Sequence, residues 1–124
     1  MDNKIKNFYD LDAWIKSHQL VINVYKITKD FPREEQFGLI SQLRRAASSI
    51  TANIAEGFER YHYKDKMRFY YQARGSTAEV QNFLLLARDL NFINLENFKT
   101  LNQEGSEIRQ LINGLIRAIE KQQL

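Results

Sequence analysis

The chain shows apolar residues at steps of three and four in four successive segments, the spacing that lines one face of an α-helix. Strict alternation of apolar and polar residues, which would indicate half-buried strands, is absent. One proline and five glycines are also few for a β-protein, which needs a turn about every ten residues. The pattern predicts an all-α protein.

The breaks in this periodicity divide the chain into four predicted helices, at about residues 12–29, from Glu34 or Gly38 to 59, 64–90 and 95–122. The carboxylate of Asp12 is expected to accept N–H groups in the first turn of the first helix, and Asn94 to cap the fourth. Phe31-Pro32 should end the first helix, because proline disfavours helical geometry in the residue before it.

Each predicted helix has one inner face built from residues three or four positions apart. The four faces are Trp14, His18, Val21, Tyr25 and Thr28; Leu39, Leu43, Ala46, Ile50, Ile54 and Phe58; Met67, Tyr70, Ala73, Thr77, Val80, Leu84 and Ala87; and Leu95, Phe98, Leu101, Ile108, Leu111, Ile112, Leu115 and Ile119. Short links between long helices make an antiparallel up-and-down four-helix bundle the simplest topology. We expect residues 1–124 to form one such domain.

Two of the predicted helices have more apolar residues than one inner face requires. The first contains Leu20-Val21-Ile22 and the third contains Leu84-Leu85-Leu86. Consecutive residues on a helix point in different directions, so some of these side chains should face away from the bundle's own core. Exposed apolar patches usually mark interfaces, which predicts a homo-oligomer. The alternative is that long helices simply bury more than one side.

Composition narrows the class of protein. There is no cysteine, which excludes disulfides, thiolate nucleophiles and cysteine-rich zinc sites and fits a cytoplasmic location. The N-terminal residues lead into no apolar run long enough for a signal peptide, and no stretch reaches the roughly 20 apolar residues that span a bilayer. The net charge of +3 is mild, so only local clustering of charge would favour a nucleic-acid partner.

A polar stripe accompanies the apolar face of the second helix, and the third helix has a matching set. The stripe contains Gln42, Arg45, Ser49, Asn53 and Glu56, and the matching set contains Arg74, Ser76 and Glu79. These side chains could form a binding site, or a hydrogen-bonded network that fixes helix register, and we favour the network. Gly75 lies beside them, and close contact with another helix would explain a glycine inside a helix.

Basic residues cluster between positions 60 and 74. This segment contains five basic residues and one acidic residue, Asp65, which gives a local charge of +4. The basic residues are Arg60, Lys64, Lys66, Arg68 and Arg74. Tyr61, His62, Tyr63, Phe69, Tyr70 and Tyr71 lie among them. Cations neutralise phosphates and exposed rings stack on unpaired bases, so the segment suits single-stranded or looped RNA. The alternative is a solvated charged face whose rings belong to the core.

Catalytic machinery is not evident in the sequence. His18 and His62 are the only histidines and lie far apart, and His18 falls on a predicted inner face. Di-iron sites in bundles use two Glu-x-x-His motifs, whereas this chain has that spacing only once, at Glu59 and His62, and it has no phosphate-binding glycine loop. We therefore expect neither an enzyme nor a cofactor or metal site.

A specific set of residues resembles a known family. The matching positions are Glu35, Phe37, Gly38 and Leu39 after Phe31-Pro32, then Gln42, Arg45, Ala46, Ser49, Ile50, Asn53, Ile54, Ala55, Glu56 and Gly57, and then Arg68, Phe69, Ala73, Gly75, Ser76 and Glu79. They resemble the bacterial four helix bundle protein family, also called the 23S rRNA intervening-sequence protein family because some members are encoded inside insertions in large-subunit rRNA genes.

The resemblance implies an antiparallel four-helix bundle and a homopentameric ring, and it brings no catalytic residues. A related branch, the accessory variability proteins of diversity-generating retroelements, assists a reverse transcriptase through a basic surface. Many members have small polar residues before the third helix, where this chain has Tyr61-His62-Tyr63. Because of that departure, the resemblance does not define where the third helix starts, nor a binding role for these three residues.

Two functions follow from these observations. In the first, the protein is an oligomeric accessory to RNA, DNA or a nucleic-acid-processing protein. Its candidate phosphate contacts are Arg44, Arg45, Arg60, Lys64, Lys66, Arg68 and Arg74. In the second, it is a protein-interaction scaffold whose charges only keep the assembly in solution.

Overall fold

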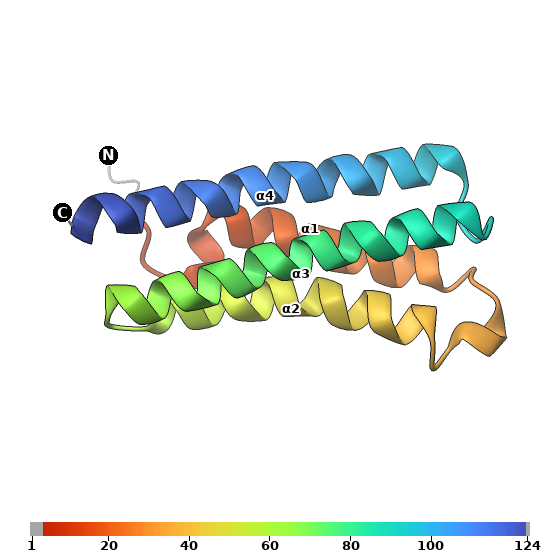
Figure 1. The fold of residues 1–124 in the computed structure, drawn as a ribbon, viewed down its shortest axis with the longest axis horizontal. Helices are drawn as coiled ribbons and strands as arrows, with labels where there is room; N and C mark the ends of the chain where they lie inside the picture. The colour runs from red at the N-terminus through yellow and green to blue at the C-terminus, as the bar shows by residue number, and fades with distance from the viewer. Residues whose placement is uncertain (1–3, 124) are drawn as a thin grey trace.

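The computed structural model describes residues 4–123 and confirms the all-α antiparallel four-helix bundle (Figure 1). The four helices are α1 (Asp12–Thr28), α2 (Leu39–Glu59), α3 (Tyr63–Asp89) and α4 (Leu95–Gln123), and two short 3-10 helices are η1 (Phe8–Asp10) and η2 (Arg33–Glu35). No strand occurs within residues 4–123. Residues 1–3 and 124, which the single-domain prediction included, lie outside the described part.

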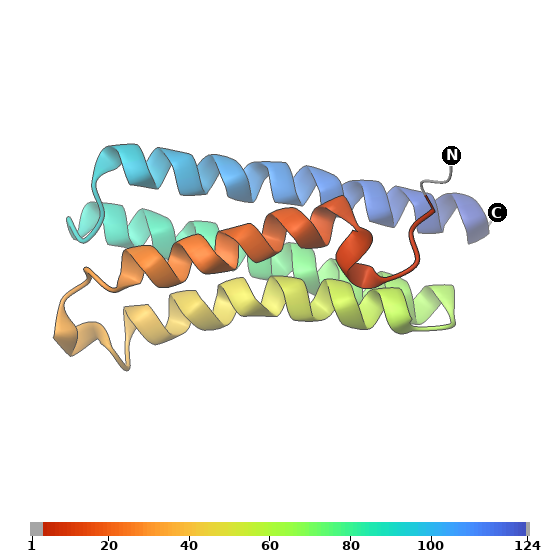
Figure 2. The same cartoon turned by 180° about the vertical axis from the view of Figure 1, so that it is seen from behind.

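Helices that follow one another in the chain pack together, and α1 also contacts α4, so the four helices close around one core. The most extensive contact is between α2 and α3. The α2–α3 turn lies at the same end of the bundle as the start of α1, and η2 lies at the opposite end with the α3–α4 turn (Figure 1). From behind, η1 is seen beside the first turns of α1 (Figure 2). Within the described residues, no helix is both long and apolar enough to cross a membrane.

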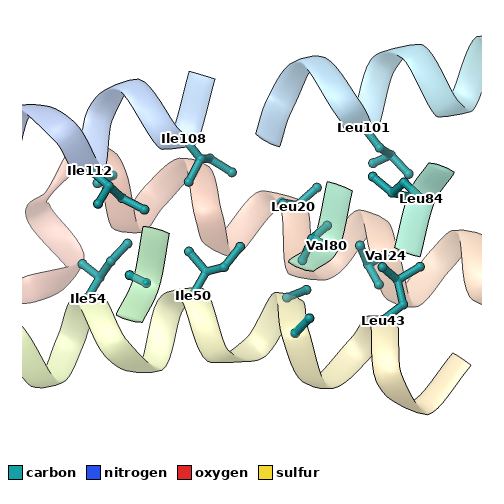
Figure 3. Close-up of a cluster of buried hydrophobic side chains, with 14 of the residues drawn as sticks. Leu20, Val24, Leu43, Ile50, Ile54, Val80, Leu84, Leu101, Ile108 and Ile112 are labelled. Carbon is teal, nitrogen blue, oxygen red and sulfur yellow. The ribbon is translucent and has the colours of Figure 1, made fainter. Parts of the chain in front are cut away.

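The core forms where the inner faces of all four helices meet (Figure 3). Its fully buried side chains include Leu20, Leu43, Ile50, Ile54, Val80, Leu84, Ile108 and Ile112. The inner faces predicted for α2 and α3 are confirmed, with Phe58 and Met67 half-buried at their ends. On α4, Leu95 is exposed, which corrects the prediction, and Ile116 is buried although it was not predicted.

The predicted inner face of α1 is wrong by about one position. The buried residues are Ala13, Ser17, Leu20, Val24 and Thr28, whereas His18 and Tyr25 are exposed and Trp14 and Val21 are half-buried. Ser17 donates to the Ala13 carbonyl at 2.6 Å, and Thr28 donates to that of Val24 at 2.7 Å. Both hydroxyls are thereby satisfied within their own helix, which allows polar residues to occupy core positions.

Trp14 lies on the flank of α1. Its indole stacks on the His18 ring with centroids 4.6 Å apart, and it meets the edge of Phe8 from η1 at 5.6 Å. The prediction that His18 lies on the inner face of the first helix is therefore wrong, because the ring lies on the surface against Trp14.

The helix ends agree with the sequence in one case and differ in others. Asn94 caps α4, since its side-chain oxygen accepts the Asn97 N–H at 2.7 Å. Asp12 is the first residue of α1, and the preceding residue makes no side-chain cap. The start of α2 is capped by the Glu35 carboxylate, which accepts the Leu39 N–H at 3.0 Å.

Gly75 does not mark a close helix contact, so that explanation is wrong. It is exposed, and a Cβ added there would meet nothing within 4 Å. The close approach is at Gly57 instead, where a Cβ would lie 2.7 Å from Cε1 of Tyr70. Glycine at position 57 lets the buried ring of Tyr70 lie directly against the α2 backbone.

Parts of the apolar runs do face away from the core. On α3, Leu84 and Ala87 are buried, whereas Leu85 is 41% exposed and Leu86 is 45% exposed. On α1, Ile22 is also exposed. The chain therefore carries apolar side chains that its own fold leaves uncovered.

Candidate nucleic-acid interface

The basic segment folds into the turn between α2 and α3, which we call the α2–α3 tip and define as residues 56–74. Because α3 begins at Tyr63, Arg60 is not on that helix; it has extended backbone angles, φ −73° and ψ 143°. The four-residue spacing of Arg60, Lys64 and Arg68 therefore does not place them along one helical face.

The turn nevertheless brings two of these cations together around one ring. The guanidinium of Arg60 lies 4.8 Å from the centroid of Phe69, and that of Arg68 lies 4.6 Å from it. The guanidinium of Arg74 lies 4.8 Å from the centroid of Tyr71. Cation–π contacts of this kind hold the charged groups in place without neutralising them.

Exposed aromatic side chains complete the α2–α3 tip. Tyr61 is 88% exposed, and His62 meets its ring edge to face at 5.1 Å. Tyr61, His62 and Tyr63 line a shallow hollow of ≈ 340 Å³. The tip thus presents rings and cations to solvent side by side.

Carboxylates reduce the positive charge of the α2–α3 tip below the value read from residues 60–74. Glu56, on the last turns of α2, accepts a hydrogen bond from Arg60 at 3.0 Å. Asp65 lies 4.0 Å from Arg68. Lys64 is exposed and forms no ion pair within residues 4–123. Lys64 is therefore the cation of the tip that is freest to meet a phosphate.

Lys66 has a structural position. Its Nζ donates to the carbonyls of Phe58 at 2.7 Å and Gly57 at 3.3 Å, both in the last turn of α2. Partial burial lowers the pKa of Lys66, with a smaller opposing effect from Glu59. Its ammonium group is turned toward the helix end, so we do not count Lys66 among the phosphate contacts proposed below.

Arg74 is also partly committed to the fold. Its Nη1 donates to the side-chain oxygen of Asn113 at 2.9 Å and so joins α3 to α4. Arg44 and Arg45 lie at the other end of α2, about 24 Å from Arg60 at 1.5 Å per residue. The seven candidate phosphate contacts therefore divide into two separate groups.

The predicted polar network is smaller than the sequence suggested. Ser76 donates to Ser49 Oγ at 2.9 Å, and Asn53 donates to the Ser49 carbonyl at 2.8 Å and to its hydroxyl at 3.0 Å. Gln42, Arg45 and Glu79 are exposed and are not joined to it. Glu56 pairs with Arg60 instead. The structure thus brings together Ser49, Asn53 and Ser76 alone.

A second polar cluster joins α3 to α4 and was not predicted. Gln81 donates to the carbonyl of Asn102 and to the hydroxyl of Ser106, both at 3.1 Å. In the sequence, Gln81, Asn102 and Ser106 are isolated polar residues that cannot be told from ordinary surface positions. The sequence therefore contains no signal for the hydrogen bonds between them. Among the described residues, no group of three or more His, Cys, Asp or Glu side chains is arranged to hold a metal ion.

Phe37 was matched to a family pattern but assigned no role from the sequence. It lies between η2 and α2 and is 90% exposed, more than any other large apolar residue of the described part. Hydropathy cannot reveal this, because an apolar ring reads as a core residue wherever it stands.

Comparisons with known proteins agree with this architecture. A family model described as 23S rRNA-intervening sequence protein matches residues 9–114. A crystal structure of a protein of unknown function from the S23 ribosomal protein family of Bacteroides thetaiotaomicron superposes with a TM-score of 0.78 at 22% identity, covering 85% of this chain and 95% of that one. At that identity the likeness concerns the fold. Among curated proteins, none matches this chain.

Proposed function

Because this chain belongs to the 23S rRNA-intervening sequence protein family, we propose that it is a non-enzymatic, cytoplasmic binding protein that contacts single-stranded or looped RNA through the α2–α3 tip. In this proposal it acts as a homo-oligomer and serves as an accessory to a nucleic acid or to a ribonucleoprotein. The family resemblance suggests a homopentameric ring.

The arrangement of cations and rings at the α2–α3 tip is the observation that carries the proposal. Arg60 and Arg68 are held against Phe69, and Tyr61 projects beside them with almost its whole ring exposed. Phosphates would meet Arg60, Lys64 and Arg68, and an unpaired base would stack on Tyr61. Duplex RNA offers no free base face, so single strands or loops are the preferred partners.

The exposed leucines of α3 support the oligomeric part of the proposal. Leu85 and Leu86 are nearly half exposed, and covering such apolar surface lowers the free energy of the protein in water. Several copies in one assembly would also place several basic tips within reach of one RNA strand, which raises the effective affinity without any new contact.

Binding of a fluorescein-labelled oligouridine, followed by fluorescence anisotropy at several salt concentrations, tests the RNA role. We expect binding that weakens steeply with salt, because each neutralised phosphate releases counterions. The triple variant Arg60→Glu, Lys64→Glu, Arg68→Glu should lose most of this binding. Its matched control is Lys99→Glu, Arg117→Glu, Lys121→Glu, which changes the net charge equally at exposed positions of α4 and should bind far better than the tip variant.

Two results would count decisively against the RNA role. One is the absence of oligouridine binding by the unmodified protein at low salt, and the other is equal binding by the tip variant and its control. Gene context offers an independent check, since a neighbouring reverse transcriptase or an rRNA gene around the reading frame favours a nucleic-acid role.

The exposed leucines also favour a second candidate, a protein-interaction scaffold. Leu86 on α3 and Leu90, the residue that follows the end of that helix, are both exposed and would suit the apolar core of a contact with another protein. This candidate predicts a protein partner in pull-downs that depends on Leu86, together with no effect of the tip substitutions on nucleic-acid retention.

A further inference from the structure

We propose that a second contact for the same RNA strand lies at the opposite end of α2, where Phe37 receives an unpaired base and Arg33 and Arg45 receive its phosphates. This inference rests on the proposed RNA role and adds a site to it. We call this site the α1–α2 corner and define it as the side chains around Arg44 at the end of α1 and the start of α2.

Two adjoining open hollows form the α1–α2 corner. The larger, of ≈ 380 Å³, lies between Tyr25, Phe37 and the first turns of α2. The smaller, of ≈ 260 Å³, lies beside the end of α1 and η2. They share Gln36, Ile40 and Arg44 as lining residues, so they adjoin one another at Arg44, and we refer to the two hollows together as one depression.

Cations line this depression and carboxylates do not. Lys29, Arg33, Arg44 and Arg45 contribute to its walls, and no Asp or Glu does. None of the four forms an ion pair within residues 4–123. The nearby carboxylate of Glu35 is turned to the start of α2, where it accepts the Leu39 N–H. An anionic ligand would therefore find positive charge that the fold has not neutralised.

Arg44 is held in one orientation before any ligand arrives. Its Nε donates to Thr28 Oγ1 at 2.8 Å and its Nη2 donates to the Tyr25 carbonyl at 3.3 Å. The guanidinium also lies 4.5 Å from the centroid of the Tyr25 ring. These contacts occupy two of the five N–H donors of an arginine and leave the others available. Because the Arg44 side chain is already fixed, it loses little conformational entropy when a ligand binds.

Phe37 supplies the face on which a base would stack. Its ring is 90% exposed and so contributes almost nothing to the core of its own chain. The hollow beside it is lined by polar and cationic side chains, among them Gln36, Ser41 and Arg45, together with Tyr25 and Ile40. Stacking on a base next to phosphates uses such a combination of exposed ring and cations.

The α1–α2 corner can be tested separately from the α2–α3 tip, because about 24 Å of α2 separates Arg44 from Arg60. The probe is the same fluorescein-labelled oligouridine, measured by anisotropy on the full chain. Phe37→Ala should weaken binding between about fivefold and a hundredfold, the range for loss of one base–aromatic stack. Phe37→Trp should bind as tightly as the unmodified protein or more tightly. Leu95→Ala, an exposed apolar residue at the same end of the bundle but outside the hollows, is the control and should not change binding.

Phe37→Leu distinguishes stacking from an apolar contact. Leucine keeps most of the apolar surface but has no π face, so RNA binding should weaken nearly as much as with alanine. Native mass spectrometry of the same variants should show an unchanged oligomeric state. If Phe37→Ala instead changes the oligomeric state and leaves RNA binding unaltered, Phe37 contacts a protein and the inference is wrong.

The cations provide a second measurement. Arg33→Ala and Arg45→Ala remove exposed side chains, so both variants should keep the fold. Each should reduce the slope of log affinity against log salt by about 0.7, the value for one phosphate contact to a single strand. Unchanged slopes in both variants would overturn the phosphate contacts.

Failure of this inference differs from failure of the proposed function. If the unmodified protein binds oligouridine and only the tip substitutions weaken it, the α2–α3 tip stands and the α1–α2 corner is refuted. If the unmodified protein binds no oligouridine, both are refuted. Weakening by both sets of substitutions supports two sites on one strand.

Discussion

Gly57 and Gly75 both lie inside helices, yet their surroundings are opposite. A methyl group at Gly57 would lie 2.7 Å from the Tyr70 ring, whereas at Gly75 it would meet open space. Gly57→Ala should therefore destabilise the protein, because overpacking of about 1–3 kcal/mol outweighs the roughly 1 kcal/mol gained in helix propensity. Urea unfolding of the variant should show a lower midpoint.

Gly75→Ala should have the reverse effect. Without a clash, alanine at an exposed position inside a helix raises the free energy of unfolding by about 1 kcal/mol. The same urea titration, performed at a concentration where the protein is unassociated, measures this gain. A loss of assembly in this variant would instead show that another copy lies close to Gly75.

Tyr70 gives a pH-dependent prediction. Burial raises its pKa from 10.0 to about 12, and only 3% of the residue is exposed. Because the pKa is raised in the folded protein, the contribution of Tyr70 to the free energy of unfolding is fully present below pH 10, where the phenol is neutral in the folded and the unfolded chain. That contribution is lost as the pH rises toward 12. The thermal midpoint of the unmodified protein should fall faster over that interval than that of Tyr70→Phe. Parallel curves would contradict the raised pKa of Tyr70.

Single residues also show where sequence reasoning stops. On α1, two stripes have helical spacing, and the predicted one carried the larger apolar side chains. The true inner face includes Ser17 and Thr28, whose hydroxyls bond to carbonyls of their own helix. A hydropathy pattern counts such residues as polar and so shifts the face toward Trp14 and Tyr25, which lie on its flank.

Between elements, the hydrogen bond from Ser76 to Ser49 links α2 and α3, the two helices with the most extensive mutual contact. A double-mutant cycle with Ser49→Ala and Ser76→Ala should show a coupling free energy of about 0.5–1.5 kcal/mol in urea unfolding. Gln42→Ala, on the same predicted stripe but exposed, is the control and should show no coupling with Ser76→Ala. Strict additivity for both pairs would mean that the serine pair does not hold the helices in register.

The sequence predicted the four long helices to within a few residues, because apolar periodicity and the Asn94 cap are local signals. It could not predict the conformation of the α2–α3 turn. That turn contains neither proline nor glycine between Arg60 and Tyr63, and Arg60 leaves the helix while still bonded to Glu56. The gathering of Arg60 and Arg68 around Phe69 depends on that turn and is a tertiary effect.

For the whole molecule, the uncovered leucines give a prediction about assembly. Leu85 and Leu86 are adjacent in sequence but project from different sides of α3. A glutamate in an apolar contact carries a desolvation cost of several kcal/mol, enough to dissociate an oligomer. Leu85→Glu or Leu86→Glu, whichever side lies in the interface, should convert the oligomer to monomer in native mass spectrometry. If both variants assemble like the unmodified protein, α3 is not part of the interface.

The bundle as a whole was predictable because four amphipathic helices leave few other arrangements. The division of its cations was not. In the sequence, Arg44 and Arg60 belong to one set of candidate phosphate contacts, but the length of α2 places them at opposite ends of that helix. Composition does not report distance along a helix. The length of α2 therefore divides the predicted phosphate contacts between two separate surfaces.

The contact of Trp14 with Phe8 and His18 has a practical consequence. Trp14 is the chain's single tryptophan, so all indole fluorescence originates at the point where η1 meets α1. Detachment of the N-terminal segment, or burial of this flank by a neighbouring copy, would change the polarity around that one fluorophore. The emission maximum of the unlabelled protein should thus report on both events.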